Sequence, residues 1–123
     1  MTRVLIVDDA MFMRKTIKRI LEGNGYDVVA EAENGYQAIS LFEQHRPDII
    51  SLDITMPELD GLETLQKLRQ INPKVKVVMV TAVGQEKLVR EAIKLGAASF
   101  LVKPFNEVQL INAFHSISKR EED

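Results

Sequence analysis

Residues 4–9 read Val-Leu-Ile-Val-Asp-Asp, and this stretch decides the fold class of the chain. Four consecutive apolar residues, rich in β-branched side chains, are typical of a strand that is buried on both faces of a sheet. The two aspartates end the run, and from Ala10 to Glu22 apolar residues recur at helical spacing. The stretch therefore predicts a buried strand that leads through an acidic loop into a helix.

The same unit of strand and helix recurs along the chain. Short apolar runs predict four more strands, and an amphipathic stretch after each predicts a helix. The expected strands are 28–32, 48–53, 75–81 and 99–103, and the expected helices are a segment through Tyr36 and Phe42, 62–71, 85–95 and 106–117. Strict alternation of this kind predicts an α/β fold with a parallel central sheet and helices on both faces.

Two helices have apolar stripes that we expect to face the sheet. In the first helix the stripe comprises Phe12, Met13, Ile17, Ile20 and Leu21, and in the fourth it comprises Leu88, Val89, Ala92 and Ile93. Residues 1–123 are expected to form one domain, and the charged segment 119–123 is expected to fray because it has no apolar face.

Composition narrows the classes of function. The 123 residues are 46% hydrophobic and 28% charged, which is typical of one soluble globular domain. A net charge of −2 gives no general attraction to nucleic acid or to an anionic membrane. The chain has no cysteine, only two distant histidines, and no apolar run that approaches the roughly 20 residues of a membrane span. The apolar run near the N-terminus is too short for a signal peptide, so we expect a cytoplasmic protein.

Reactive side chains stand at the carboxyl ends of four predicted strands. Asp8 and Asp9 follow the first strand, Asp53 ends the third, Thr81 the fourth and Lys103 the fifth. In an open parallel sheet, ligands bind beyond the carboxyl ends of the strands, so we expect these groups to meet at one edge. The second strand contributes only two poorer candidates, Glu31 and Glu33.

Such a cluster favours phosphoryl-transfer chemistry. Neighbouring carboxylates repel and raise one another's pKa, and Mg²⁺, which prefers oxygen ligands, relieves that repulsion. A lysine and a hydroxyl in the same place can bind phosphoryl oxygens, and an aspartate can accept a phosphoryl group as an acyl phosphate. The loop 53–61 does not match an EF-hand, because Glu58 stands where glycine is needed, and the chain has no glycine-rich nucleotide motif.

Each of these residues also has a simpler interpretation when taken alone. Asp9 could cap the first helix, Thr81 could be an ordinary strand-end residue, Lys103 a solvated lysine and Asp53 a loop acid. His45 and His115 are expected on helix surfaces. The joint placement at four strand ends favours the functional interpretation.

Four motifs together resemble the receiver domain of bacterial two-component response regulators, over residues 3–118. They are Val4–Asp9, Asp53 with Met56-Pro57 and Gly61, Val80-Thr81-Ala82, and Lys103-Pro104-Phe105. The segments Asp8–Arg14 and Asp53–Glu58 are most similar to stand-alone chemotaxis regulators. The resemblance implies a flavodoxin-like, doubly wound (βα)5 sandwich of three layers, with strand order 2-1-3-4-5.

The resemblance also implies roles at the site. Asp53 would be the phosphoacceptor for a histidine kinase. Mg²⁺ would be held by Asp8, Asp9, Asp53 and the backbone carbonyl of Thr55. Thr81 and Lys103 would contact the phosphoryl oxygens.

Further implied roles concern signalling. On phosphorylation Thr81 would move inward and Phe100 would turn in behind it; the alternative for Phe100 is a core aromatic that never moves. Thr55 and Val83 would flank the path of the attacking water, and we expect the apolar Val83 to slow self-dephosphorylation. The output surface would be residues 85–117, with a mixed-charge helix face at Glu86, Lys87, Arg90, Glu91 and Lys94.

The predicted function is a phosphorylation-controlled binding module in chemotaxis, with no separate turnover substrate. Expected partners are a histidine kinase and either a phosphatase or a protein that binds the phosphorylated form, for which the flagellar motor switch is one candidate. No direct nucleic-acid partner and no membrane insertion are expected. The alternatives are a phosphorelay intermediate, the receiver half of a longer DNA-binding or enzymatic regulator, and a Mg²⁺-dependent phosphatase or phosphotransferase with Asp60 as a possible acid.

Overall fold

Five strands and five helices alternate along the chain. The structure is a computed structural model that describes residues 1–122 and, for residues 119–122, the backbone alone. The elements are β1 (Arg3–Val7), α1 (Met11–Glu22), β2 (Asp27–Ala32), α2 (Gly35–His45), β3 (Ile49–Asp53), α3 (Gly61–Ile71), β4 (Lys76–Ala82), α4 (Glu86–Lys94), β5 (Ser99–Lys103) and α5 (Glu107–Glu122). The predicted α/β class is confirmed.

The strands form one parallel sheet in the order β2-β1-β3-β4-β5, which confirms the expected topology. The register pairs Val7 with Leu52, and Asp53 with Val80. Consequently the ends of β1, β3 and β4 lie at the same edge of the sheet. The strands β2 and β5 form the two lateral edges, which leaves Glu31 and Glu33 away from the centre.

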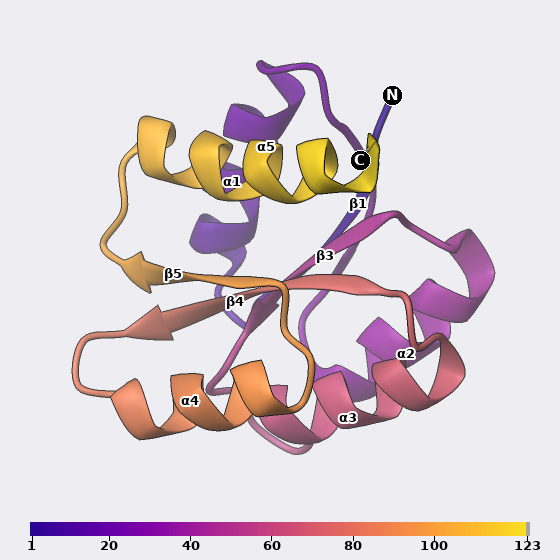
Figure 1. Cartoon of the computed structure of the whole chain (residues 1–123), viewed down its shortest axis with the longest axis vertical. Helices are drawn as coiled ribbons and strands as arrows, with labels where there is room; N and C mark the ends of the chain where they lie inside the picture. The colour runs from indigo at the N-terminus through magenta and orange to yellow at the C-terminus, as the bar shows by residue number, and fades with distance from the viewer. Residues whose placement is uncertain (123) are drawn as a thin grey trace.

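Helices cover the sheet in two layers (Figure 1). Helices α1 and α5 lie on one face, and α2, α3 and α4 lie on the other. Side chains alternate along β1 accordingly: Val4 and Ile6 pack in the core beneath α1 and α5, whereas Leu5 and Val7 pack in the opposite core. The apolar run of β1 is therefore buried on both faces, as its sequence predicts.

Two expected core residues are exposed. Phe12 is 81% exposed and Ile93 is 45% exposed. Phe12 lies in the first turn of α1, where the helix turns this side chain away from the buried Ile17 and Leu21. Ile93 lines an open groove between α4 and the edge strand β5.

The last helix is longer than expected. Its backbone remains helical to Glu122, beyond the end predicted at Ile117. The expected frayed segment 119–123 therefore begins as helix, and residue 123 lies outside the described residues. Within residues 1–122, no helix has both the length and the apolar character needed to cross a membrane.

Candidate functional site

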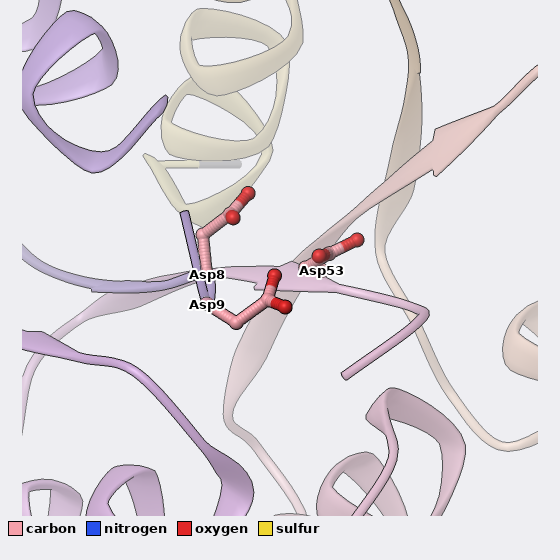
Figure 2. A group of neighbouring side chains, drawn as sticks. All are labelled: Asp8, Asp9 and Asp53. Carbon is pink, nitrogen blue, oxygen red and sulfur yellow. The ribbon is translucent and has the colours of Figure 1, made fainter. Parts of the chain in front are cut away.

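Three aspartates meet at the carboxyl ends of β1 and β3, as Figure 2 shows. Asp8 and Asp53 are buried, with 1% and 6% exposure, and Asp9 is exposed. One carboxylate oxygen from each lies within 4.8 Å of the others. The pairing of β1 with β3 produces this cluster, because both strands end at the same level.

Burial and charge act together on Asp53. The pKa of its carboxyl is raised to about 6, mainly because this buried position has lost hydration and also because the charged Asp8 lies nearby. The Lys103 ammonium and a hydrogen bond from the Thr55 N–H, at 3.4 Å, act in the opposite direction. Asp53 is therefore a carboxylate whose negative charge is incompletely balanced by the protein.

Lys103 reaches the cluster from β5. Its Nζ lies 3.2 Å from Asp8 Oδ2 and 3.7 Å from Asp53 Oδ1. The other Asp8 oxygen, Oδ1, accepts the Ala10 N–H at 2.9 Å. Lys103 is therefore no freely solvated strand-end lysine: it is the cation that bridges two of the three acids.

The donor set fits Mg²⁺. The cluster offers only oxygen donors, which Mg²⁺ prefers, and it contains more negative charge than Lys103 can neutralise. The exposed Asp9 leaves one side open to water, and Mg²⁺ in proteins usually retains several water ligands. The backbone carbonyl of Thr55, two residues after Asp53, is the fourth ligand implied by the family resemblance, and it stays a prediction.

Thr81 is buried at the end of β4, and its hydroxyl is engaged away from the acids. The hydroxyl donates to Gln85 Oε1 at 2.7 Å and has a longer contact of 3.2 Å with the Ala82 carbonyl. Gln85 Nε2 in turn donates to Thr55 Oγ1 at 2.7 Å. Thr81 and Thr55 are thus linked through one glutamine.

Phe100 and Val83 line a groove beside the site. The groove has a volume of about 570 Å³ and lies between α4 and β5. Phe100 is 47% exposed and Val83 is 78% exposed. The alternative that Phe100 is a core aromatic is therefore wrong for this state of the protein.

The structure shows which of two acids caps a helix. Helix α1 begins after Ala10 without any side-chain cap, so Asp9 does not cap it. Asp60, the suggested acid of a phosphatase, caps α3 instead, because its Oδ1 accepts the Glu63 N–H at 2.9 Å. The Glu31 carboxylate pairs with the cations of Arg14, Lys15 and Lys18 at the edge of the sheet.

Glycine 61 holds the loop after Asp53 in place. Its N–H donates to the Ile54 carbonyl at 2.8 Å. A β-carbon on Gly61 would collide with the Asp53 carbonyl and the Ile54 backbone. The motif glycine is therefore needed because α3 begins directly against the loop that carries the reactive aspartate.

Sequence reasoning missed two residues at this site. Arg14, which the sequence assigns no role at the site, is buried, and its Nη1 donates to the Asp8 carbonyl at 2.7 Å. Gln85 was assigned only to the start of a helix. Its one local signal is the rarity of glutamine at a helix N-terminus, where Ser, Thr, Asp and Asn are preferred.

Comparison with known proteins gives consistent matches. The family model "Response regulator receiver domain" matches residues 4–115. The chain is 49% identical to the chemotaxis protein CheY of Bacillus subtilis, covering 92% of this chain and 94% of the relative. It is 44% identical to CheY of Thermotoga maritima, covering 95% and 98%. A crystal structure of a CheX-CheY-BeF3-Mg²⁺ complex from Borrelia burgdorferi is similar, with a TM-score of 0.91 and 33% identity over 95% of this chain and 89% of that one.

Proposed function

Because this chain belongs to the response regulator receiver family and is closely related to the chemotaxis protein CheY, we propose that Asp53 accepts a phosphoryl group from a histidine kinase. Phosphorylation then changes the surface formed by α4, β5 and α5, which binds a protein partner in the cytoplasm. The observation that carries the proposal is the cluster of Asp8, Asp9 and Asp53 with the Lys103 ammonium between two of its members.

The chemistry follows from the positions of these groups. An oxygen of the Asp53 carboxylate attacks phosphorus, an O–P bond forms, and the P–N bond to the donor imidazole breaks with its electron pair returning to nitrogen. Lys103 lies 3.7 Å from Asp53 and can bind an oxygen of the transferred group. Thr81 donates a second hydrogen bond once its hydroxyl leaves Gln85. No separate substrate is turned over, so the protein acts as a phosphoacceptor.

Asp8, Asp9, Asp53 and the Thr55 carbonyl are the residues that would hold Mg²⁺. When bound, Mg²⁺ supplies positive charge that offsets both the carboxylates and the phosphoryl oxygens. The protein contributes the arrangement: Arg14 fixes the Asp8 backbone, and the Ala10 N–H fixes the Asp8 side chain.

The groove between α4 and β5 supports the proposed output surface. Its apolar lining includes Phe100, Ile93 and Val102, which are all exposed. The charged residues that surround it include Glu86, Arg90 and Lys94. The inward turn of Phe100 that the family resemblance implies would remove apolar surface from this groove, and a partner that binds there would respond to that change. The partner can be the motor switch or a phosphatase; CheX is present with CheY in the similar complex from Borrelia burgdorferi.

Intact mass spectrometry tests the phosphoacceptor role. Wild type incubated with acetyl phosphate and Mg²⁺ should gain one phosphoryl group, whereas wild type with EDTA and Asp53→Asn with Mg²⁺ should gain none. Asp27→Asn, at the exposed start of β2, is the matched control and should behave as wild type. A gain that persists in Asp53→Asn would show that another residue is the nucleophile.

The same assay addresses the lifetime and the alternatives. After acetyl phosphate is removed, Val83→Glu should lose its phosphoryl group faster than wild type if apolar Val83 hinders water. Return of the phosphoryl group to a histidine phosphotransfer protein would favour a phosphorelay intermediate instead. Release of many phosphates per chain would favour a phosphatase.

A further inference from the structure

The side chain of Gln85 occupies a position between two of the candidate site residues. Its Oε1 accepts the Thr81 hydroxyl at 2.7 Å and the Ala82 N–H at 2.8 Å. Its Nε2 donates to Thr55 Oγ1 at 2.7 Å. Both acceptor positions of the amide oxygen are thus used by β4, and the amide nitrogen reaches the loop that follows β3.

Gln85 is also the residue from which α4 begins, yet its side chain does not cap that helix. The chain turns sharply just before it, at Gly84, whose φ of 92° is a conformation that favours glycine. This turn directs Gln85 back onto the end of β4. The start of α4 is therefore tied by side-chain hydrogen bonds to the strand that carries Thr81.

The single hydroxyl proton of Thr81 makes two arrangements mutually exclusive. While the hydroxyl donates to Gln85, it cannot donate to an oxygen on Asp53. Moving Thr81 toward a phosphoryl group must therefore break its bond to Gln85. That step leaves Gln85 with an unfilled acceptor position, and it loosens the link between β4 and the first turn of α4.

We propose that Gln85 is a positioning residue that holds the Thr81 hydroxyl away from Asp53 in the unphosphorylated protein. It opposes phosphorylation, and it connects the state of Thr81 to the N-terminal end of α4. The proposal rests on the function proposed above, because it assigns Thr81 to the phosphorylated state.

The side-chain rotamer of Thr81 provides a direct test in the unphosphorylated protein. Three-bond couplings from the Thr81 methyl carbon to the backbone nitrogen and carbonyl carbon, measured by NMR, report this rotamer. Wild type should show one rotamer, and Gln85→Met, similar in size but unable to accept these bonds, should show averaging. Gln85→Glu keeps an acceptor oxygen and should restore the wild-type couplings. Gln44→Met, on the exposed last turn of α2, is the matched control.

The rate of phosphorylation tests the functional consequence. With acetyl phosphate and Mg²⁺, Gln85→Met should gain phosphoryl mass about threefold to fivefold faster than wild type, the factor expected for one half-exposed hydrogen bond. Gln44→Met should match wild type.

The two measurements separate the possible failures. Identical Thr81 couplings in wild type and Gln85→Met would overturn the proposal, whatever the rate. Altered couplings with an unchanged or slower rate would overturn the claim that Gln85 opposes phosphorylation. If wild type gains no phosphoryl mass at all, the proposed function fails, whereas the couplings still decide whether Gln85 positions Thr81.

Discussion

Asp53 combines a place in the acidic cluster at the sheet edge with an unfavourable environment for its charge. Burial is the main cause of its raised pKa, and the proximity of Asp8 adds to it. Lys103 compensates only in part, because it lies closer to Asp8 than to Asp53. The charged form of Asp53 is therefore destabilised in the folded protein until a cation or a phosphoryl group changes the balance.

Stability should depend on pH through Asp53. Its pKa rises on folding from 3.8 to about 6, so the folded protein binds this proton more tightly, and stability falls as pH rises through that window. Without Mg²⁺, Asp53→Asn should be more stable than wild type at pH 7 by about 1–2 kcal/mol, a value reduced for the partial access of water. The difference should shrink toward pH 4.

Urea denaturation at pH 4 to 7 measures this difference. Asp27→Asn is the matched control, because it removes an exposed carboxylate far from the cluster. A stability gain in Asp53→Asn that stays constant over the whole range would contradict the assignment of the effect to the titration of Asp53.

At the scale of single elements, the helix starts have different roles. Helix α3 is capped by Asp60, and α2 by Asn34, whose side chain accepts the Gln37 N–H. Helices α1 and α4 start beside the reactive cluster and have no side-chain cap. The starts of α1 and α4 are held instead by contacts with the site, through Arg14 and Gln85.

The capping role of Asp60 can be separated from a catalytic one. Asp60→Ala should lower the free energy of unfolding by about 1 kcal/mol, because the Glu63 N–H loses its partner. Asp60→Asn should lower it much less, since asparagine caps nearly as well. Both variants should be phosphorylated by acetyl phosphate at the wild-type rate, measured by intact mass. A large loss of phosphorylation in Asp60→Asn would return Asp60 to consideration as an acid.

At the scale of the whole molecule, the winding of the chain assembles the site. Because all strands are parallel, residues from β1, β3, β4 and β5 reach one edge of the sheet, although Asp8 and Lys103 are 95 positions apart in sequence. Each face of the sheet has its own core of buried side chains, and the two cores share the strands between them. Figure 1 shows the helices that cover each face. We therefore expect binding at this edge to stabilise both cores together.

Mg²⁺ should stabilise the whole fold. A ligand that binds only the folded state adds about 1.4 kcal/mol when its concentration is ten times its Kd. The urea midpoint of wild type should therefore rise with Mg²⁺ concentration and return to its starting value with EDTA. Asp9→Asn, which removes an exposed carboxylate of the cluster, should show a much smaller rise. An equal rise in both proteins would place Mg²⁺ binding elsewhere.

Local patterns in the sequence are enough to predict the fold class and the members of the acidic cluster. Runs such as Val4–Val7 are local signals, and a strand buried on both faces needs little more than its own side chains to be identified. The alternation of strands and helices then placed Asp8, Asp9, Asp53, Thr81 and Lys103 at one edge by topology alone. Strand order was available only through the family resemblance.

The tertiary structure alone decided which side chains face solvent and which hydroxyl bonds to which partner. Helical periodicity predicts Phe12 and Ile93 in the core, where the structure does not place them. It gives no sign that Arg14 is buried and donates to the Asp8 carbonyl. Gln85 and Thr55, 30 positions apart, meet only because β3 and β4 are neighbours. The physical reason is the distance along the sequence over which each property is specified. A strand or helix is specified by residues a few positions apart. Exposure and side-chain hydrogen bonds depend on elements that only folding brings together.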